Sequence, residues 1–262
     1  MEAQFSEAGV EARIDSYRAD GIELRYAETG AHVSGDGANA GVLFIHGAPG
    51  SLDAFFPFLT DNRLTKEFRL FSVDRPGYGF SDFGNPTTSL RRQAALIVPL
   101  LRRAAQAGRV VVVGHSYGAT IAVRLAMDYP RLVHGLILVA GAVDPFVEPI
   151  FWFNEPAEWP IVKWAVPAVW QVANAEKLTH VEELEKMLPL WRDLTVPIHA
   201  FHGTNDGLVP VENAYFVEGL SSGPTELTIY EGAGHFILWE RSEDIVNSIF
   251  SMMDRSVDAP AE

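Results

Sequence analysis

The stretch VVVVGHSYG at residues 110–118 decides how this chain folds. Its four valines, 110–113, form a short apolar run typical of a strand that is buried on both faces. From Tyr117 to position 127, small and apolar residues recur with helical spacing. Gly114 and Gly118 flank Ser116 and allow the close backbone approach of a tight strand-to-helix turn. The stretch therefore predicts a turn that presents the Ser116 hydroxyl at the carboxyl end of a strand.

The same kind of strand is predicted elsewhere along the chain. Apolar runs bounded by Gly, Pro or polar turns occur at residues 42–45, 70–73, 136–139, 198–201 and 227–230. Helical patterns cover residues 89–107, 211–220 and 241–253. Strands that alternate with helices indicate βαβ units, hence an α/β fold with a mostly parallel sheet and helices on both faces. Before them, Asp20-Gly21 predicts a hairpin between residues 12–17 and 22–27.

One long stretch, residues 144–190, breaks this alternation. It contains no strand-like run between turns and is rich in Pro and Trp. We expect a helical cap, or lid, over 144–190. It would be inserted into a core domain formed by residues 1–143 and 191–262.

Two further side chains follow predicted strands and would complete the chemistry of Ser116. A serine hydroxyl is a poor nucleophile until a base removes its proton. His235 follows the strand at 227–230 and is the candidate base. Asp206 follows the strand at 198–201 and is the candidate acid that fixes the imidazole tautomer. Asp144, after the strand at 136–139, is the alternative acid; otherwise it forms a turn or caps a helix.

A second requirement of acyl transfer is a pair of N–H groups that stabilise the charge on the carbonyl oxygen. The first donor is expected to be the backbone N–H of Tyr117, directly after the nucleophile. The second is expected from the loop HGAPG at 46–50, which follows the strand at 42–45. We choose the N–H of Ala48, because Pro49 has none to offer.

The motifs HGAPG (46–50), DRPGYGFSD (74–82), GHSYG (114–118), HGTNDGLVP (202–210) and GAGHF (232–236) resemble, in order and spacing, those of the α/β-hydrolase superfamily. The chain is similar to its small capped members, such as esterases, proline iminopeptidases, epoxide hydrolases and haloalkane dehalogenases. The resemblance implies an eight-stranded, mostly parallel sheet, a lid over the site and a metal-free covalent mechanism. It also implies catalytic roles for Ser116, Asp206 and His235.

Departures from the family patterns narrow the activity. Epoxide hydrolases and dehalogenases carry Asp as the nucleophile, whereas this chain has Ser116. HGAPG differs from the HGGPG typical of iminopeptidases, although the acidic residues Glu148, Glu155 and Glu158 of the expected cap would suit a substrate amine.

Aromatic residues suggest an apolar substrate pocket. About half of those in the expected cap would form its own core, because a short helical insertion must bury something. The others would line a pocket above Ser116. We assign five residues to it: Phe55, Phe56, Phe151, Trp152 and Phe236.

Other polar residues are given structural roles. His199 and His202 stand three apart on a strand, so their side chains point to opposite faces and shared metal ligation is not expected. His46 is expected to pack beneath the 46–50 loop. Asp74 and Arg75 are expected to brace the loop 76–82 as a local ion pair or turn network. No metal or cofactor is predicted.

Composition limits the partners. The formal net charge of −14 gives no positive field for nucleic acids or anionic membrane surfaces. Cysteine is absent, so no disulfide framework or thiolate metal site is expected. No apolar run reaches the length of a membrane span, and the first 21 residues lack a secretory pattern. We therefore expect a cytoplasmic monomer or homodimer that acts on a small molecule.

The sequence thus predicts a serine hydrolase that cleaves a small, largely apolar carboxylic ester through an acyl-enzyme. Hydrolysis of a C–C bond in a diketone-like substrate, or of an amide as in an aminopeptidase, would use the same triad. A third hypothesis is a ligand receptor that keeps the triad but does not catalyse a reaction, because a fold does not determine a function.

Overall fold

A computed structural model describes residues 1–31 and 40–254. Its centre is one eight-stranded sheet with strand order β1-β2-β4-β3-β5-β6-β7-β8. The fold is α/β, with the mostly parallel sheet that the sequence predicts. Among the described strands, the β1–β2 and β2–β4 pairings are antiparallel and the other pairings are parallel. The strands are β1 (Ala12–Ala19), β2 (Ile22–Gly30), β3 (Ala40–Ile45), β4 (Arg69–Val73), β5 (Arg109–His115), β6 (Gly135–Val139), β7 (Ile198–Gly203) and β8 (Thr225–Tyr230).

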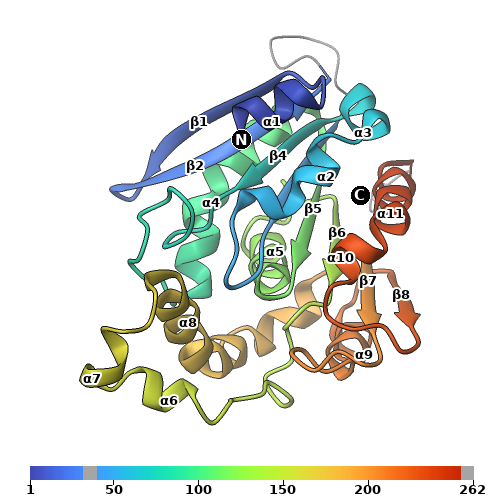
Figure 1. Ribbon diagram of the computed structural model, residues 1–262. Helices are drawn as coiled ribbons and strands as arrows, with labels where there is room; N and C mark the ends of the chain where they lie inside the picture. The colour runs from blue at the N-terminus through green and yellow to red at the C-terminus, as the bar shows by residue number, and fades with distance from the viewer. Residues whose placement is uncertain (32–39, 255–262) are drawn as a thin grey trace.

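The first two strands form the hairpin expected from Asp20-Gly21. Both turn residues have positive φ, 48° at Asp20 and 78° at Gly21, which is the conformation that such a two-residue turn requires. The hairpin joins the sheet through β4 (Figure 1).

Alternate residues of the central strands face two separate apolar layers. In β5, Val110 and Val112 belong to one core cluster, and Val111 and Val113 belong to the other. Because helices cover both faces of the sheet, the sequences of these strands are continuous apolar runs. The first face packs on α4 (Leu90–Ala104), α5 (Tyr117–Asp128) and α9 (Glu212–Leu220). The second packs on α1 (Glu2–Glu7), α2 (Phe56–Leu59), α3 (Asn62–Glu67), α10 (Ile237–Glu240), α11 (Ser242–Asp254) and the 3₁₀ turn η1 (Leu52–Phe55).

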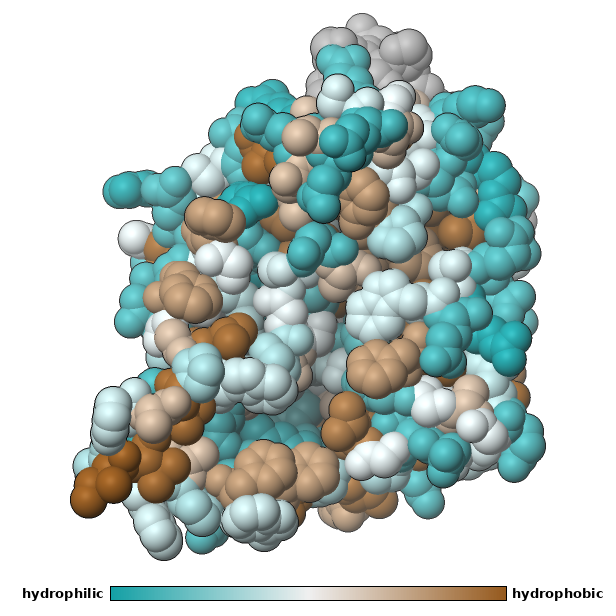
Figure 2. Space-filling model, in the orientation of Figure 1, coloured by the Kyte–Doolittle hydropathy of each residue, from teal (hydrophilic) through white to brown (hydrophobic). Residues whose placement is uncertain are grey.

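The segment between β6 and β7 is helical. It holds α6 (Asn154–Ala157), α7 (Pro160–Lys163), α8 (Ala168–Glu185) and the 3₁₀ turn η3 (Leu188–Asp193); a further 3₁₀ turn, η2 (Ala105–Ala107), follows α4. Figure 1 shows α6, α7 and α8 together at one end of the molecule. Trp191 in η3 is buried in the core and contacts Phe216. Residues of α7, in contrast, form an exposed apolar surface at the lower left of Figure 2.

No helix in residues 1–31 and 40–254 is both long enough and apolar enough to cross a membrane.

Candidate active site

Ser116 lies in a strained turn between β5 and α5. Its φ is 53° and its ψ is −125°, in a region that residues other than glycine rarely adopt. Gly118 is required beside it, because a Cβ there would come within 2.2 Å of the Ile45 carbonyl oxygen. At Gly114, a Cβ would come within 2.5 Å of the Ala119 Cα. The turn therefore holds the serine at the carboxyl edge of the sheet, at the N-terminus of α5, as the sequence predicts.

Asp206 and His235 meet beyond the ends of β7 and β8. The His235 Nδ1 lies 2.7 Å from Asp206 Oδ2, and the Asp206 side chain is fully buried. Burial opposes the charged form, but hydrogen bonds from His235 and from the N–H groups of Leu208 and Val209 hold the pKa of Asp206 below its ordinary value. The carboxylate therefore keeps the proton of the imidazole on Nδ1, which leaves Nε2 available as a base.

Ser116 and His235 line the same cavity, which has a volume of about 630 Å³. Within the described part of the chain, no hydrogen bond joins the Ser116 hydroxyl to the His235 ring. Such bonds are often long before substrate binds and tighten during the reaction.

The two expected N–H donors also border this cavity, which Ala48 and Tyr117 both line. Neither backbone N–H has an acceptor among residues 1–31 and 40–254. The loop carrying Ala48 passes close to Ser116, because a Cβ on Gly47 would come within 2.9 Å of the Ser116 Cβ. A carbonyl oxygen beside Ser116 would therefore find two unpaired donors.

Comparison with known protein families identifies the fold that carries these residues. Residues 42–165, which include β3, β5 and Ser116, match the family model described as alpha/beta hydrolase fold. Over these residues the chain is similar to the α/β hydrolases, and its sheet has the α/β-hydrolase fold. A curated relative, an uncharacterised protein of Mycobacterium tuberculosis, is 25% identical over 274 residues, covering 86% of this chain and 78% of the relative.

Solved structures share the fold of this protein. Cfl2 from Burkholderia cenocepacia superposes with a TM-score of 0.74 at 20% identity, covering 92% of this chain and 95% of Cfl2. An E-2-(acetamidomethylene)succinate hydrolase superposes with a TM-score of 0.65 at 22% identity, covering 93% of this chain and all of that protein.

The alternative acid, Asp144, does not contact His235. Its Oδ1 accepts the N–H of Phe146 at 2.8 Å, and its own N–H donates to Asn213 Oδ1 at 2.8 Å. Asp144 thus stabilises the turn where the helical segment begins, and Asp206 is the carboxylate that contacts His235.

The aromatic residues assigned to the pocket divide into two groups. Phe151 and Trp152 line the cavity, together with Phe153 and Trp170. The assignment of Phe55 is wrong, because its ring is fully buried in the core, 4.9 Å from that of Phe44.

Two other pocket assignments also fail. The Phe56 ring packs on Phe5 of α1, with ring centres 5.0 Å apart, on the other side of the loop. Phe236 follows His235, but its ring is exposed beside Trp239 and does not line the cavity. Both residues stand near catalytic motifs in the sequence, and the local turns direct their side chains elsewhere.

Of the three acidic residues considered for amine binding, Glu148 and Glu158 are already paired, and Glu155 is exposed and does not line the cavity. Glu148 lines the cavity, but its Oε1 contacts both Lys177 and the Nδ1 of His180, the latter at 2.9 Å. Burial favours the neutral acid, yet these two partners lower the pKa of Glu148. Glu158 pairs with Lys163. To bind a substrate amine, an aminopeptidase needs a carboxylate that no cation of its own chain neutralises. Glu148 does not meet this requirement, because Lys177 already pairs with it.

The remaining histidines have separate partners. His199 contacts Ser248 and Thr228, while the His202 Nε2 lies 2.9 Å from the Val209 carbonyl oxygen. Among the described residues, no group of three His, Cys, Asp or Glu side chains is arranged to hold a metal ion. His46 is buried beneath the 46–50 loop, where sequence analysis placed it.

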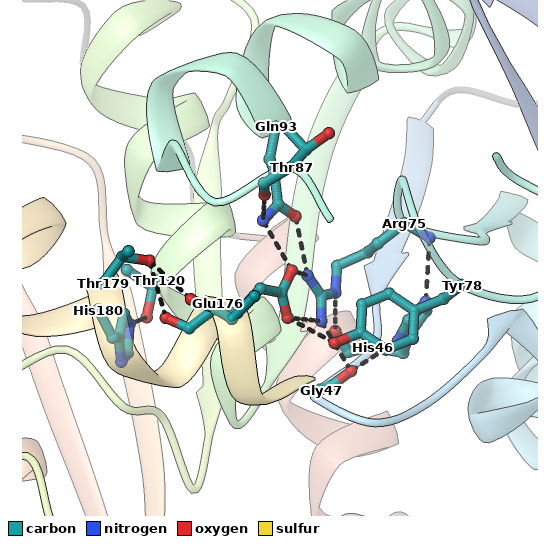
Figure 3. A network of polar contacts seen from close by, with 11 residues as sticks. His46, Gly47, Arg75, Tyr78, Thr87, Gln93, Thr120, Glu176, Thr179 and His180 are labelled. Carbon is teal, nitrogen blue, oxygen red and sulfur yellow. Dashed lines mark hydrogen bonds and ion pairs between the residues drawn. The ribbon is translucent and has the colours of Figure 1, made fainter. Parts of the chain in front are cut away.

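Arg75 differs from expectation. Asp74 does brace the following loop, since it accepts the Phe80 N–H at 3.0 Å. Arg75, however, is fully buried and forms an ion pair with Glu176 of α8, 2.6 Å away (Figure 3). Sequence analysis missed Glu176 because the two residues lie 101 positions apart and no local pattern marks the pair.

A buried histidine is expected to make this protein less stable in acid. Burial, and then the charge of His235, lower the pKa of His115 to about 3. The unfolded chain takes up a proton on this residue near pH 6.5, whereas the native state stays neutral until about pH 3. The unfolded state therefore binds more protons, and the free energy of unfolding is expected to fall as pH drops from 6.5 towards 3.

Urea unfolding at pH 7 and pH 5 tests this expectation. Replacement His115→Asn should reduce the loss of stability between the two pH values, because one source of differential protonation is gone. Equal losses in both proteins would show that His115 contributes nothing to the acid sensitivity.

Proposed function

We propose that this protein is a serine hydrolase that cleaves small, largely apolar carboxylic esters. One observation carries the proposal: Ser116, in its strained turn, shares a cavity with the imidazole of His235, whose Nδ1 is fixed at 2.7 Å by the buried Asp206. The similarity of residues 42–165 to the alpha/beta hydrolase fold family supports hydrolysis as the reaction class.

In the proposed reaction, His235 Nε2 takes the proton of the Ser116 hydroxyl as the serine oxygen bonds to the ester carbonyl carbon. The Ala48 and Tyr117 N–H groups stabilise the resulting oxyanion. His235 then gives the proton to the leaving alkoxide, and an acyl-serine remains. Water, deprotonated by His235, attacks the acyl-serine. His235 then returns this proton to the Ser116 oxygen as the C–O bond breaks, which releases the acid and restores the free serine.

The cavity lining supports an apolar substrate. Around the polar groups, the surface of the cavity is formed by aromatic and aliphatic side chains. Most of these come from the segment between β6 and β7: Phe151, Trp152, Phe153, Val162, Val166 and Trp170. We therefore propose that residues 144–190 act as a cap that selects the substrate.

Hydrolysis of p-nitrophenyl esters, from acetate to dodecanoate, tests the proposed activity. We expect turnover with a maximum at one acyl length, because a cavity of about 630 Å³ with an apolar lining can bury acyl chains only up to a limited length. If none of the esters is hydrolysed above the background rate, the proposed ester hydrolysis is wrong.

Replacement Phe151→Ala is expected to move this maximum towards longer acyl chains, since it enlarges the cavity. The matched control is Trp164→Ala, which removes an aromatic residue of the same segment that is 80% exposed and does not line the cavity. An unchanged length profile in Phe151→Ala would show that the acyl chain does not reach this wall.

A further inference from the structure

Arg75 holds the loop that carries the proposed oxyanion donor Ala48. Its side chain extends from the loop after β4 into the interior, where it has no exposure to solvent. Its Nε donates to the His46 carbonyl oxygen at 2.9 Å, and its Nη2 donates to the Gly47 carbonyl oxygen at 3.0 Å (Figure 3).

His46 supplies a second donor to the Gly47 carbonyl. The backbone N–H of Arg75 donates to His46 Nε2 at 3.0 Å, so the ring proton sits on Nδ1, which lies 2.7 Å from the Gly47 oxygen. Burial, and then the charge of Arg75, hold the pKa of His46 well below its ordinary value, which keeps this neutral tautomer. Two N–H groups therefore fix the direction of one carbonyl.

Fixing the Gly47 carbonyl also fixes the Ala48 N–H, because both belong to the same planar peptide. In a trans peptide the C=O and N–H point in opposite directions. Arg75 and His46 bind the carbonyl on the interior side, and Ala48 lines the cavity together with Ser116. A rotated peptide would lose both hydrogen bonds and would direct a carbonyl oxygen, instead of an N–H, at the oxyanion.

Glu176 of α8 in turn holds Arg75. Its two oxygens lie 2.6 Å from Nη1 and 3.1 Å from Nη2 of the guanidinium, and they also accept from Tyr78 Oη at 2.6 Å and Gln93 Nε2 at 2.8 Å. The Glu176 side chain is fully buried. If α8 moved away from the sheet, it would leave an uncompensated buried charge on Arg75, which is strongly unfavourable.

We infer that Arg75 is a positioning residue for the oxyanion donor Ala48, and that Glu176 makes the donor geometry depend on the docking of α8 against the core. The proposed cap therefore helps to assemble the catalytic site in addition to shaping the pocket. This inference rests on the proposed serine hydrolase mechanism.

Three variants test the role of Arg75. Arg75→Met removes both carbonyl contacts, and Glu176→Gln keeps the shape of the partner but removes its charge. Arg69→Met is the matched control: Arg69 also pairs with a fully buried carboxylate, Glu28, but at the opposite end of β4, away from the cavity. Each variant is compared with wild type by circular dichroism and thermal melting, so that only folded protein is assayed.

For folded Arg75→Met we expect kcat to fall about 10²-fold, similar to loss of one oxyanion donor, with little change in KM. An alkyl trifluoromethyl ketone, which forms a tetrahedral adduct with the serine, should bind more weakly by the same factor. The corresponding alcohol, which needs no oxyanion donor, should inhibit wild type and variant equally. Glu176→Gln should show the same pattern with a fall of about tenfold, and Arg69→Met should match wild type.

If Glu176→Gln keeps the wild-type kcat and the wild-type affinity for the trifluoromethyl ketone, the role given to α8 is wrong. If folded Arg75→Met keeps both values, the whole inference is wrong. If Arg75→Met does not fold, the kcat and ketone affinity of Glu176→Gln alone decide whether the inference stands. Failure of the proposed function can be distinguished from failure of this inference. In that case the wild-type protein would neither hydrolyse esters nor react at Ser116 with a fluorophosphonate.

Discussion

Replacement Ser116→Ala is expected to abolish ester hydrolysis, with kcat falling by at least about 10⁴-fold. Alanine leaves the strand, the turn and the α5 N-terminus in place, but it removes the atom that attacks the carbonyl. Because the flanking Gly114 and Gly118 accommodate the turn, the melting temperature should change little. The measurement is kcat on the best p-nitrophenyl ester, together with a thermal melt.

Covalent labelling separates loss of the nucleophile from loss of the pocket. An alkyl fluorophosphonate should add one phosphonyl group to wild type at Ser116 and none to Ser116→Ala, as read by mass spectrometry of the peptide that contains β5 and α5. Retained hydrolysis in Ser116→Ala, or labelling at another serine, would contradict the role given to Ser116.

The second large effect is expected from Asp206→Asn, which should lower kcat about 10⁴-fold. An amide in place of the carboxylate can present its NH₂ group to His235 Nδ1, which then becomes an acceptor, so the ring proton moves to Nε2. The base needed by Ser116 is then lost. The side-chain oxygen of asparagine can still accept the N–H groups of Leu208 and Val209, so the loop should keep its shape.

Asp144→Asn is the matched control, since Asp144 is also a buried carboxylate at the carboxyl edge of the sheet. It accepts the Phe146 N–H, which asparagine can also do, so its kcat should stay close to that of wild type. A loss of activity in Asp144→Asn together with an active Asp206→Asn would show that the acid has been assigned to the wrong residue.

Local signals explain why much of the site could be predicted. The positions of Ser116, Asp206 and His235 follow from short apolar strands and the turns after them, and parallel strands bring their carboxyl ends to one edge. The same reasoning places Ala48 and Tyr117 beside them. None of these predictions requires knowledge of how helices pack.

Predictions that depend on the direction of a side chain were less successful. Phe55 and Phe56 follow the 46–50 loop closely in sequence, but η1 and α2 direct their rings to the core and to Phe5. Phe236 is adjacent to the base, yet its ring lies outside the cavity. A shift of one residue in a tight turn changes the direction in which a side chain points. The apolar composition of the segment does not predict that direction.

The sheet, the turn at Ser116 and the order of the three candidate catalytic residues can be predicted from the amino-acid sequence, because each is encoded within a few consecutive residues. Which aromatic residues border the cavity, and the pairing of Arg75 with Glu176, depend on how distant parts of the chain pack together. That pair joins the loop after β4 to α8 across 101 positions. A buried guanidinium can take any carboxylate that the fold brings within reach, so its partner is set by the packing of α8 on the core and not by the neighbouring residues.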